Sequence, residues 1–364
     1  MHAATGQLKM MASLETVEEL TAKGALTSRQ LEQIRLIQQV KNYAEKELGV
    51  KKTDNYGKIY SRPMKQVLQV VCACPKDAFK LKTWWFPVVG RMPYLGFFSH
   101  EKAQREKEKL EKQGYDVVIR DAEAYSTLGW FNDPITMNML DRSPVVLADT
   151  IIHELTHVTV YVKGQGSFNE GLALFMGRLG AAQFLQSTRG PDHPESQLAR
   201  HIVHDERLFS DFLDGLLKDL ESFYSSPITH QEKIAGREKV YLQGLERFQK
   251  IKPRLKTTIF WNFGQSEINN AELLSIALYH RYFSIFEATY ALNNGNLKST
   301  LHFFVRLARE SQGDLLRLTR ERLRSQGLVG KAATGLPYGH WSRGFIFYHD
   351  RNNCTLFTAI DNYS

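Results

Sequence analysis

Residues 143–173 read SPVVLADTIIHELTHVTVYVKGQGSFNEGLA and contain two apolar runs with helical spacing, joined by a short turn. Ser143 followed by Pro144 is typical of a helix start, because serine caps the first turn and proline is tolerated at the first helical position. Gly164 is typical of a helix end, and the Gly-Gln-Gly-Ser turn that starts there lets the chain double back. The sequence therefore predicts two consecutive helices within this stretch.

The first of these helices carries two histidines, His153 and His157, with Glu154 directly after the first. Residues four apart on a helix project from the same face one turn apart, so both imidazoles can reach one metal ion. Glu154 can then lie beside a water at the metal and accept its proton. The alternative is an ordinary helix with two histidines, but buried polar groups on so apolar a helix need partners. The pattern therefore favours a catalytic metal site with Glu154 as general base.

The second apolar run opens with an Asn-Glu pair, and Glu170 is the carboxylate placed to be a third metal ligand. Two histidines and one glutamate leave a fourth position open to water, which is the ligand set of a catalytic zinc site rather than a structural one. The alternative for Glu170 is an ordinary acid near a helix N-terminus, where the helix dipole stabilises it. The expected cofactor is Zn2+, and the motif alone predicts metal-assisted hydrolysis.

Composition excludes several classes of protein. The chain has 364 residues, enough for one large domain or two closely packed lobes. Its net charge is +8, but the Lys and Arg residues are spread over amphipathic helices without a nucleic-acid motif, so we expect no nucleic-acid partner. Cys72, Cys74 and Cys354 are too few for a disulfide-stapled fold, and the first two are expected as buried small hydrophobes. No run of about 18 apolar residues predicts a transmembrane helix.

The rest of the pattern is strand-like before the helix pair and helical after it. Runs rich in β-branched and aromatic residues predict strands at 67–74, 83–89, 92–98, 115–120 and 127–131. Apolar residues at helical spacing predict helices at 6–48, 100–113, 194–248 with a break at Pro227, 269–290 and 301–324.

This order predicts an α+β fold, with a small mixed β-sheet lobe followed by a mainly helical lobe. A zincin-like active-site helix is expected in the cleft between the two lobes. Residues 1–142 are predicted to form the N-terminal helix and the mixed-sheet lobe, and residues 143–329 the metal-binding, helical catalytic lobe. Residues 330–364 have no helical period, and we interpret them as a tail of unknown role.

Residues 153–157 read His-Glu-Leu-Thr-His, an HExxH motif, and are followed by Phe168-Asn169-Glu170-Gly171-Leu172-Ala173. This combination resembles the gluzincin metallopeptidases, in which a glutamate on the next helix is the third zinc ligand. A closer resemblance is to a family of bacterial predicted zinc aminopeptidases. The stretches that carry it run in order to about residue 310, and among them are Thr83–Gly90, Tyr125–Pro134, His153–Gly164 and Asn269–Ala271. The resemblance implies a zinc aminopeptidase that acts on peptide substrates.

The resemblance also bears on location. Members of the family often carry a lipoprotein-type export signal, which implies a protein of the cell envelope or periplasm if such a signal has been removed from this chain. A lipid anchor absent from this chain would then associate the protein with a membrane surface. If the chain is complete as given, we expect it to be cytoplasmic.

Further site residues follow from the resemblance. Gluzincins use a Tyr or His from a downstream helix to stabilise the oxyanion, and this implies Tyr279, with His280 and Tyr282 as alternatives. The competing interpretation of Tyr279 is a core tyrosine whose hydroxyl is satisfied. The strand expected before the metal helix pairs with extended substrates in these enzymes, so the substrate-binding candidates are Trp130, Asn132 and Asp133.

Two positions depart from the pattern of the family. Relatives commonly have an acidic residue seven positions after the ligand glutamate, where this chain has Gly177, and gluzincins often have one four positions after it that orients a histidine, where this chain has Leu174. Either another group orients the histidines, or they are less well oriented. These departures keep open a metal-bearing but non-catalytic scaffold of the cell envelope as an alternative, and a zinc endopeptidase is the rival within the enzymes.

Overall fold

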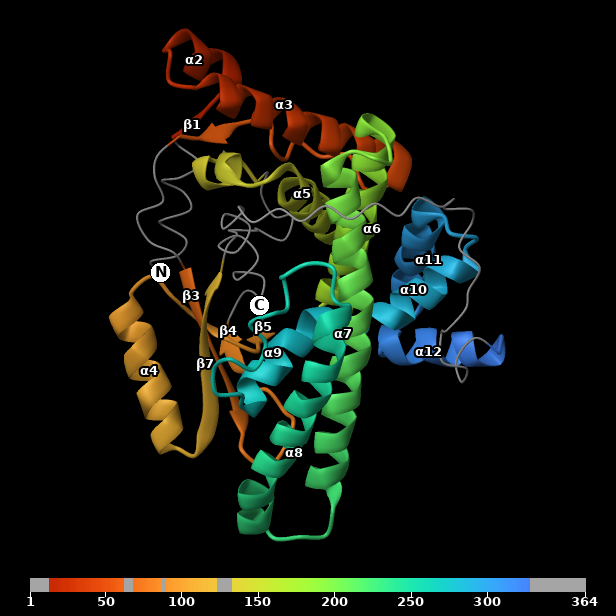
Figure 1. Cartoon of the computed structure of the whole chain (residues 1–364). Coiled ribbons are helices and arrows are strands. Elements are labelled where there is room, and N and C mark those ends of the chain that lie inside the picture. Colours follow the sequence, from red (N-terminus) through yellow and green to blue (C-terminus); the bar gives the residue numbers. More distant parts are fainter. Residues whose placement is uncertain (1–12, 62–67, 87–89, 123–132, 328–364) are drawn as a thin grey trace.

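The computed structural model describes residues 13–61, 68–86, 90–122 and 133–327, and Figure 1 shows their arrangement. The strands are β1 (Leu14–Glu15), β2 (Ile59–Tyr60), β3 (Leu68–Pro75), β4 (Trp84–Phe86), β5 (Gly90–Met92), β6 (Leu95–Phe97), β7 (Tyr115–Ala122) and β8 (Ile135–Thr136). The α-helices are α2 (Val17–Ala22), α3 (Ser28–Tyr43), α4 (His100–Lys112), α5 (Pro144–Thr159), α6 (Gly166–Arg189), α7 (Pro194–Ser225), α8 (His230–Ile251), α9 (Asn270–His280), α10 (Phe283–Leu292), α11 (Leu297–Glu310) and α12 (Leu315–Ser325). The fold is α+β, as the sequence predicts, with small sheets and a larger helical part.

The sheet with strand order β6-β3-β7 is antiparallel, and helices cover both of its faces (Figure 1). On one face, Val71, Ala73 and Val117 pack against Ala103 and Leu110 of α4. On the other face lies α9, whose first residues bond to the strands. The side-chain amide of Asn269 donates to the Val117 carbonyl at 3.3 Å, and that of Asn270 donates to the Pro75 carbonyl at 3.0 Å. The sheet therefore positions the start of α9.

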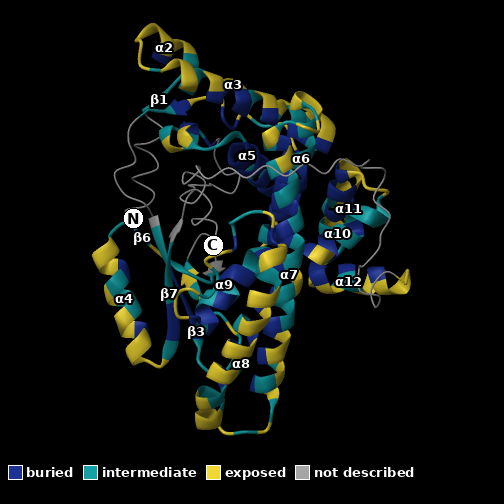
Figure 2. Ribbon diagram, in the orientation of Figure 1, coloured by how far each residue is buried: buried dark blue, intermediate teal, exposed yellow. Residues whose placement is uncertain are grey.

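Helix α5 begins as its sequence predicts. The Ser143 hydroxyl accepts a hydrogen bond from the Val146 amide, and Pro144 occupies the first helical turn. The helix lies between α3 and α6, and Figure 2 shows that most of it is buried. Gly180 of α6 makes the close approach possible, because an added Cβ would lie 3.0 Å from an Ile152 methyl and 2.8 Å from one of Leu48. The largest core cluster forms around this contact.

Three predicted helices are wrong in extent. Within 6–48 the described residues form the short strand β1 and two helices, α2 and α3, and Gly24, with a φ of 61°, lies in the turn between the helices. The segment 269–290, predicted as one helix, forms two: α9 ends at His280 and α10 starts at Phe283. The pattern over 301–324 is also two helices, α11 and α12, and Asp314 caps the second through the Arg317 amide. The break between α9 and α10 contains neither Gly nor Pro, and the apolar periodicity runs across it, so no helix stop signal is present at this point.

The other predictions of organisation have different outcomes. The division at residue 142 stays a prediction, and the predicted tail and the predicted strand at 127–131 lie outside the described residues. Among the described helices, none is both long and apolar enough to cross a membrane. Cys72 and Cys74 are buried free cysteines on β3, as predicted.

Candidate functional site

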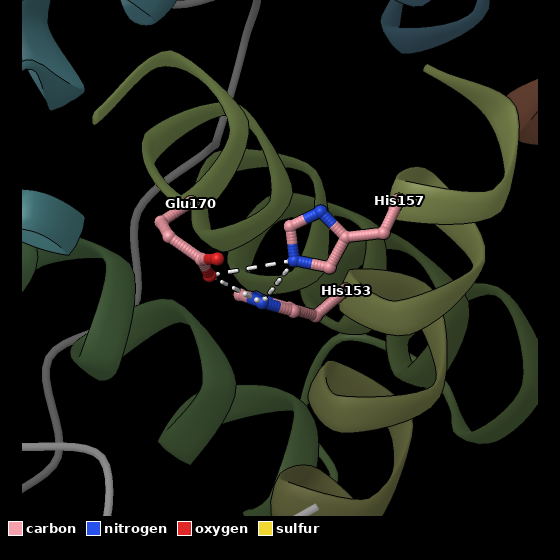
Figure 3. A group of neighbouring side chains, drawn as sticks. All are labelled: His153, His157 and Glu170. Atoms are coloured by element: carbon pink, nitrogen blue, oxygen red, sulfur yellow. Dashed lines mark hydrogen bonds and ion pairs between the residues drawn. The ribbon is translucent and has the colours of Figure 1, made fainter. Parts of the chain in front are cut away.

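Three side chains from α5 and α6 converge on one point, as Figure 3 shows. The Nε2 atoms of His153 and His157 lie 3.1 Å apart. The Oε2 atom of Glu170 lies 3.4 Å from each of them. Within the described part of the chain, this triad is the one group of three or more His, Cys, Asp or Glu side chains that could hold a metal ion. The structure therefore brings together the three residues that the sequence predicts as ligands.

The dimensions of the triad can be compared with those of a zinc site. Zinc bonds to nitrogen and oxygen are about 2.0–2.1 Å long, so two ligand atoms at a tetrahedral angle lie about 3.3–3.4 Å apart. The triangle of 3.1, 3.4 and 3.4 Å is close to this size. Two imidazole nitrogens that face each other need a shared cation or a proton, because two lone pairs at this distance repel. The donor types and their spacing fit a zinc ion.

Charge at the triad also fits a cation. Burial alone would raise the pKa of Glu170, but His157 and the hydrogen bonds from both histidines outweigh it and hold this pKa well below its usual range. Burial would lower the pKa of His157, but the Glu170 carboxylate outweighs it and raises this pKa. Glu170 is therefore an ionised carboxylate that faces two nitrogen donors in a buried place.

The turn between the two helices is held by Asn169, which is almost fully buried. Its side-chain oxygen accepts from the Val162 amide and its side-chain nitrogen donates to the Val162 carbonyl, both at 2.9 Å. These two bonds replace a backbone pair and clamp the start of α6 to the end of α5. Because Glu170 is the next residue, the clamp fixes where its carboxylate can reach. This explains physically why an Asn-Glu pair stands here.

Glu154 lies on the same helix and is partly exposed, between the two buried histidines. Its carboxylate is close enough to His157 to act on it electrostatically. Its Oε2 atom is buried and has no hydrogen-bond partner among the described residues. A carboxylate oxygen in this situation can accept a hydrogen bond from a molecule that enters the site.

Tyr279 is the downstream tyrosine that reaches the site. Its ring stacks on that of His153, with centroids 6.3 Å apart and an angle of 26°. His280 and Tyr282, the alternative candidates, make contacts with other residues. His280 turns to Glu206, with its Nδ1 atom 2.6 Å from a carboxylate oxygen, and the ring of Tyr282 packs beneath the Arg281 guanidinium.

The predicted substrate-binding residues are placed only in part. Asp133 is buried just before β8, and its carbonyl accepts a hydrogen bond from the Tyr56 amide at 2.7 Å. Trp130 and Asn132 lie outside the described residues. A role for these three side chains in substrate binding stays a prediction.

A row of buried ionisable side chains, which the sequence did not predict, links four helices. Its members are Asp149 of α5, Arg178 of α6, Glu206 of α7 and His280 of α9. Arg178 bonds to the Asp149 carboxylate through Nη1, and its Nε atom lies 3.5 Å from the Glu206 carboxylate. Asp149 interacts electrostatically with His153, one turn along the same helix. We call this set the buried charge row, and it connects α5 to α9.

The surroundings of Gly177 explain why no acidic residue stands at this position, where relatives commonly have one. A Cβ at this position would overlap the Asp149 carboxylate, and it would lie 2.9 Å from the Asp149 carbonyl and 3.4 Å from the His153 Cβ. An acidic side chain here would therefore exclude Asp149, and the glycine leaves room for an acid that comes from α5 instead. Asp149 stands four residues before His153, and that spacing was the signal available in the sequence. Leu174, at the other departure, is buried in the main core.

Comparison with known proteins gives one match. The model of a protein family described as "Putative aminopeptidase" matches residues 1–315. That range contains the triad, Glu154, Tyr279 and the buried charge row, and it ends before the predicted tail. No curated protein and no solved structure matches the chain.

Proposed function

The chain belongs to the family described as "Putative aminopeptidase", and we propose that it is a zinc-dependent aminopeptidase that removes amino-terminal residues from peptides. The observation that carries the metal dependence is the triangle of His153, His157 and Glu170, whose edges of 3.1 to 3.4 Å suit a tetrahedral zinc ion. Family membership supports peptide hydrolysis, and the triad supports a metal as the electrophile.

Each residue then has a defined part in the reaction. His153 and His157 bind as neutral imidazoles, and Glu170 binds as a carboxylate. When bound, zinc would polarise the scissile carbonyl and lower the pKa of water. Glu154 accepts a proton from the attacking water and delivers it to the leaving amine. The Tyr279 hydroxyl donates a hydrogen bond to the carbonyl oxygen as negative charge develops on it.

The buried charge row orients the first of these groups. A histidine ligand needs a partner that fixes its ring and raises its basicity. In this proposal the Asp149 carboxylate supports His153 electrostatically and not through a hydrogen bond to its ring, and Arg178 keeps the carboxylate in place. Asp149 thus supplies the acid whose absence at Leu174 and Gly177 motivated the non-catalytic alternative.

The test combines metal content with activity. Wild-type protein and the Glu154→Gln variant are loaded with zinc, and their metal content is measured. Cleavage is then followed on pairs of peptides that differ only in a free or acetylated amino terminus. We expect one zinc per chain in both proteins, cleavage of the free-amino peptides only, and loss of cleavage in the variant. The surface variant Glu101→Gln on α4 is the matched control, since its side chain is 74% exposed.

Each other outcome has a distinct meaning. Cleavage of the acetylated peptides would make the protein an endopeptidase. Zinc binding without turnover on any peptide would favour the non-catalytic scaffold. Failure to retain zinc after reconstitution would rule out the metal site itself, whatever the activity.

A further inference from the structure

Arg120 lies on the face of the β6-β3-β7 sheet that is turned toward α9. Side chains alternate along a strand, so Arg120 of β7 shares a face with Asp116, four residues earlier. Asp116 accepts from the Asn270 amide of α9 at 3.0 Å, which shows that this face meets α9. Val117, on the opposite face, packs under α4. The Arg120 side chain therefore extends from the sheet toward the helix that carries Tyr279.

The surroundings of Arg120 leave its charge poorly satisfied. Its side chain is only 14% exposed, yet the nearest carboxylate oxygen, on Glu272 of α9, is 4.0 Å away. Its Nε atom is buried and has no hydrogen-bond partner among the described residues. The Nε atom of Arg237, directed at the same sheet face, is likewise buried without a hydrogen-bond partner among the described residues. The contrast lies in its terminal nitrogens, which bind the Asp116 carboxylate at 2.6 and 3.1 Å and the Lys76 carbonyl at 3.0 Å.

A buried cation without close partners is costly to a folded protein. Burial lowers the pKa of Arg120, and Glu272 offsets this effect only in part. A group of this kind marks a candidate binding site, where a ligand can provide the missing partner. An anion that enters beside Arg120 would gain the hydrogen bonds that the chain itself does not supply.

The position of Arg120 relative to the triad follows from α9. Glu272, which lies 4.0 Å from Arg120, and Tyr279 stand seven residues apart on this helix, so they lie on one face about two turns from each other. The ring of Tyr279 stacks on that of His153. Arg120 therefore lies on the side of the triad from which α9 presents Tyr279.

We propose that Arg120 binds the carboxylate of a peptide substrate, and that the site therefore selects short peptides with a free carboxyl terminus. The proposal rests on the proposed peptidase function. A guanidinium binds a carboxylate through two parallel hydrogen bonds, and it does so better than an ammonium group does. A carboxylate one or two residues past the scissile bond lies within about 7 Å of it in an extended chain. Di- and tripeptides are the substrates that meet this condition.

The experiment measures binding in a protein that does not turn over its substrate. The zinc-loaded Glu154→Gln variant is titrated calorimetrically with leucyl-glycyl-glycine, with the amide of this tripeptide, and with the amide of leucyl-aspartyl-glycine. We expect the free acid to bind about 10- to 100-fold more tightly than its amide, the range for a charge-assisted hydrogen bond. Adding Arg120→Gln to the variant should abolish this preference and leave the affinity for the amide unchanged.

Two further variants separate recognition from structure. Arg120→Lys keeps the charge without the planar fork, so it should restore part of the preference. Arg207→Gln is the matched control, because Arg207 is a partly buried arginine that pairs with Glu287 of α10, and it should not change the preference. Because Arg120→Gln removes a poorly paired buried charge, its melting temperature should not fall, whereas loss of a structural ion pair would lower it.

Several results would overturn the proposal. Equal affinity of the starting variant for acid and amide would do so, and so would an equal loss of both affinities in Arg120→Gln. If the aspartyl amide bound tightly and the free tripeptide did not, the carboxylate would come from a side chain, and the assignment to short peptides would be wrong. None of these results depends on turnover, so they are distinct from a failure of the proposed catalytic function.

Discussion

Gly177→Ala perturbs the contact between the metal helix and α6 at its closest point. The added methyl group would overlap the Asp149 carboxylate and lie 2.9 Å from the Asp149 carbonyl, which belongs to a helix backbone and cannot move without shifting α5. The carboxylate is bonded to Arg178, so its displacement also weakens a buried ion pair. We therefore expect both a loss of stability and a change at His153.

The size of both effects can be worked out. Overpacking of a well-packed site costs about 1–3 kcal/mol. With an unfolding entropy of about 2.1 cal/mol/K per residue for 364 residues, this cost lowers Tm by roughly 1–4 °C. Displacing the partner of a histidine ligand weakens metal binding by about 10- to 100-fold. The assays are thermal unfolding without metal and zinc affinity by competition with a chromophoric chelator.

Gly215→Ala is the control for this prediction. Gly215 also lies within a long helix, α7, but an added Cβ there would meet no atom within 4 Å. Alanine should therefore stabilise this helix by about 0.5–1 kcal/mol through its higher helix propensity, with no effect on zinc. The reasoning is refuted if Gly177→Ala behaves like Gly215→Ala, or if it loses stability while zinc affinity stays the same.

Three further predictions concern the clamp, the oxyanion and the pH dependence. Asn169→Ala removes both bonds to Val162 and should lower zinc affinity together with stability, the latter by about 1–3 kcal/mol, as measured by chelator competition and urea unfolding. Tyr279→Phe should reduce kcat by about 100-fold with little change in KM, as steady-state kinetics on a free-amino peptide will show. Burial would raise the pKa of Glu206, but His280 and Arg178 outweigh it and hold this pKa below the ordinary 4.5. The Glu206 carboxylate therefore contributes its full stabilisation above about pH 4.5, and this stabilisation is lost as the pH falls below that value. In urea unfolding between pH 3 and 6, the free energy of unfolding of Glu206→Gln should lack this decrease at low pH.

Local sequence features predict the triad because its members stand on two consecutive helices. The spacing of His153 and His157 is one helical turn, and the Asn-Glu pair begins the next helix after a single glycine-containing turn. Backbone geometry alone then limits where these side chains can meet. The fold class follows from the same local patterns, because strand-like runs precede and helical periodicity follows this helix pair.

Contacts between distant segments could not be predicted in this way. Arg178, Glu206 and His280 come from three helices whose relative packing depends on the whole core, and each looks like an ordinary polar residue in its own sequence context. Arg120 is similarly one charged residue near the end of a strand, and its significance depends on the tertiary approach of α9. The break between α9 and α10 was missed for a related reason, since packing of both helices on α6 ends the first one without a glycine or proline.

The ionisable side chains of the buried charge row are paired with one another, whereas on the side of the sheet the positive charge of Arg120 has no close partner among the described residues. In the buried charge row, from Asp149 to His280, acids and bases alternate and each has a close partner. Toward the sheet, the one carboxylate near Arg120 among the described residues is that of Glu272 at 4.0 Å, and a divalent metal at the proposed site would have Glu170 as its one anionic ligand and would retain a net positive charge. Such an excess of positive charge would attract the carboxylate end of a peptide and repel its ammonium end. Under the two proposals, the carboxyl terminus of a short peptide would therefore lie toward β7, the scissile carbonyl at the metal, and the amino-terminal residue away from Arg120.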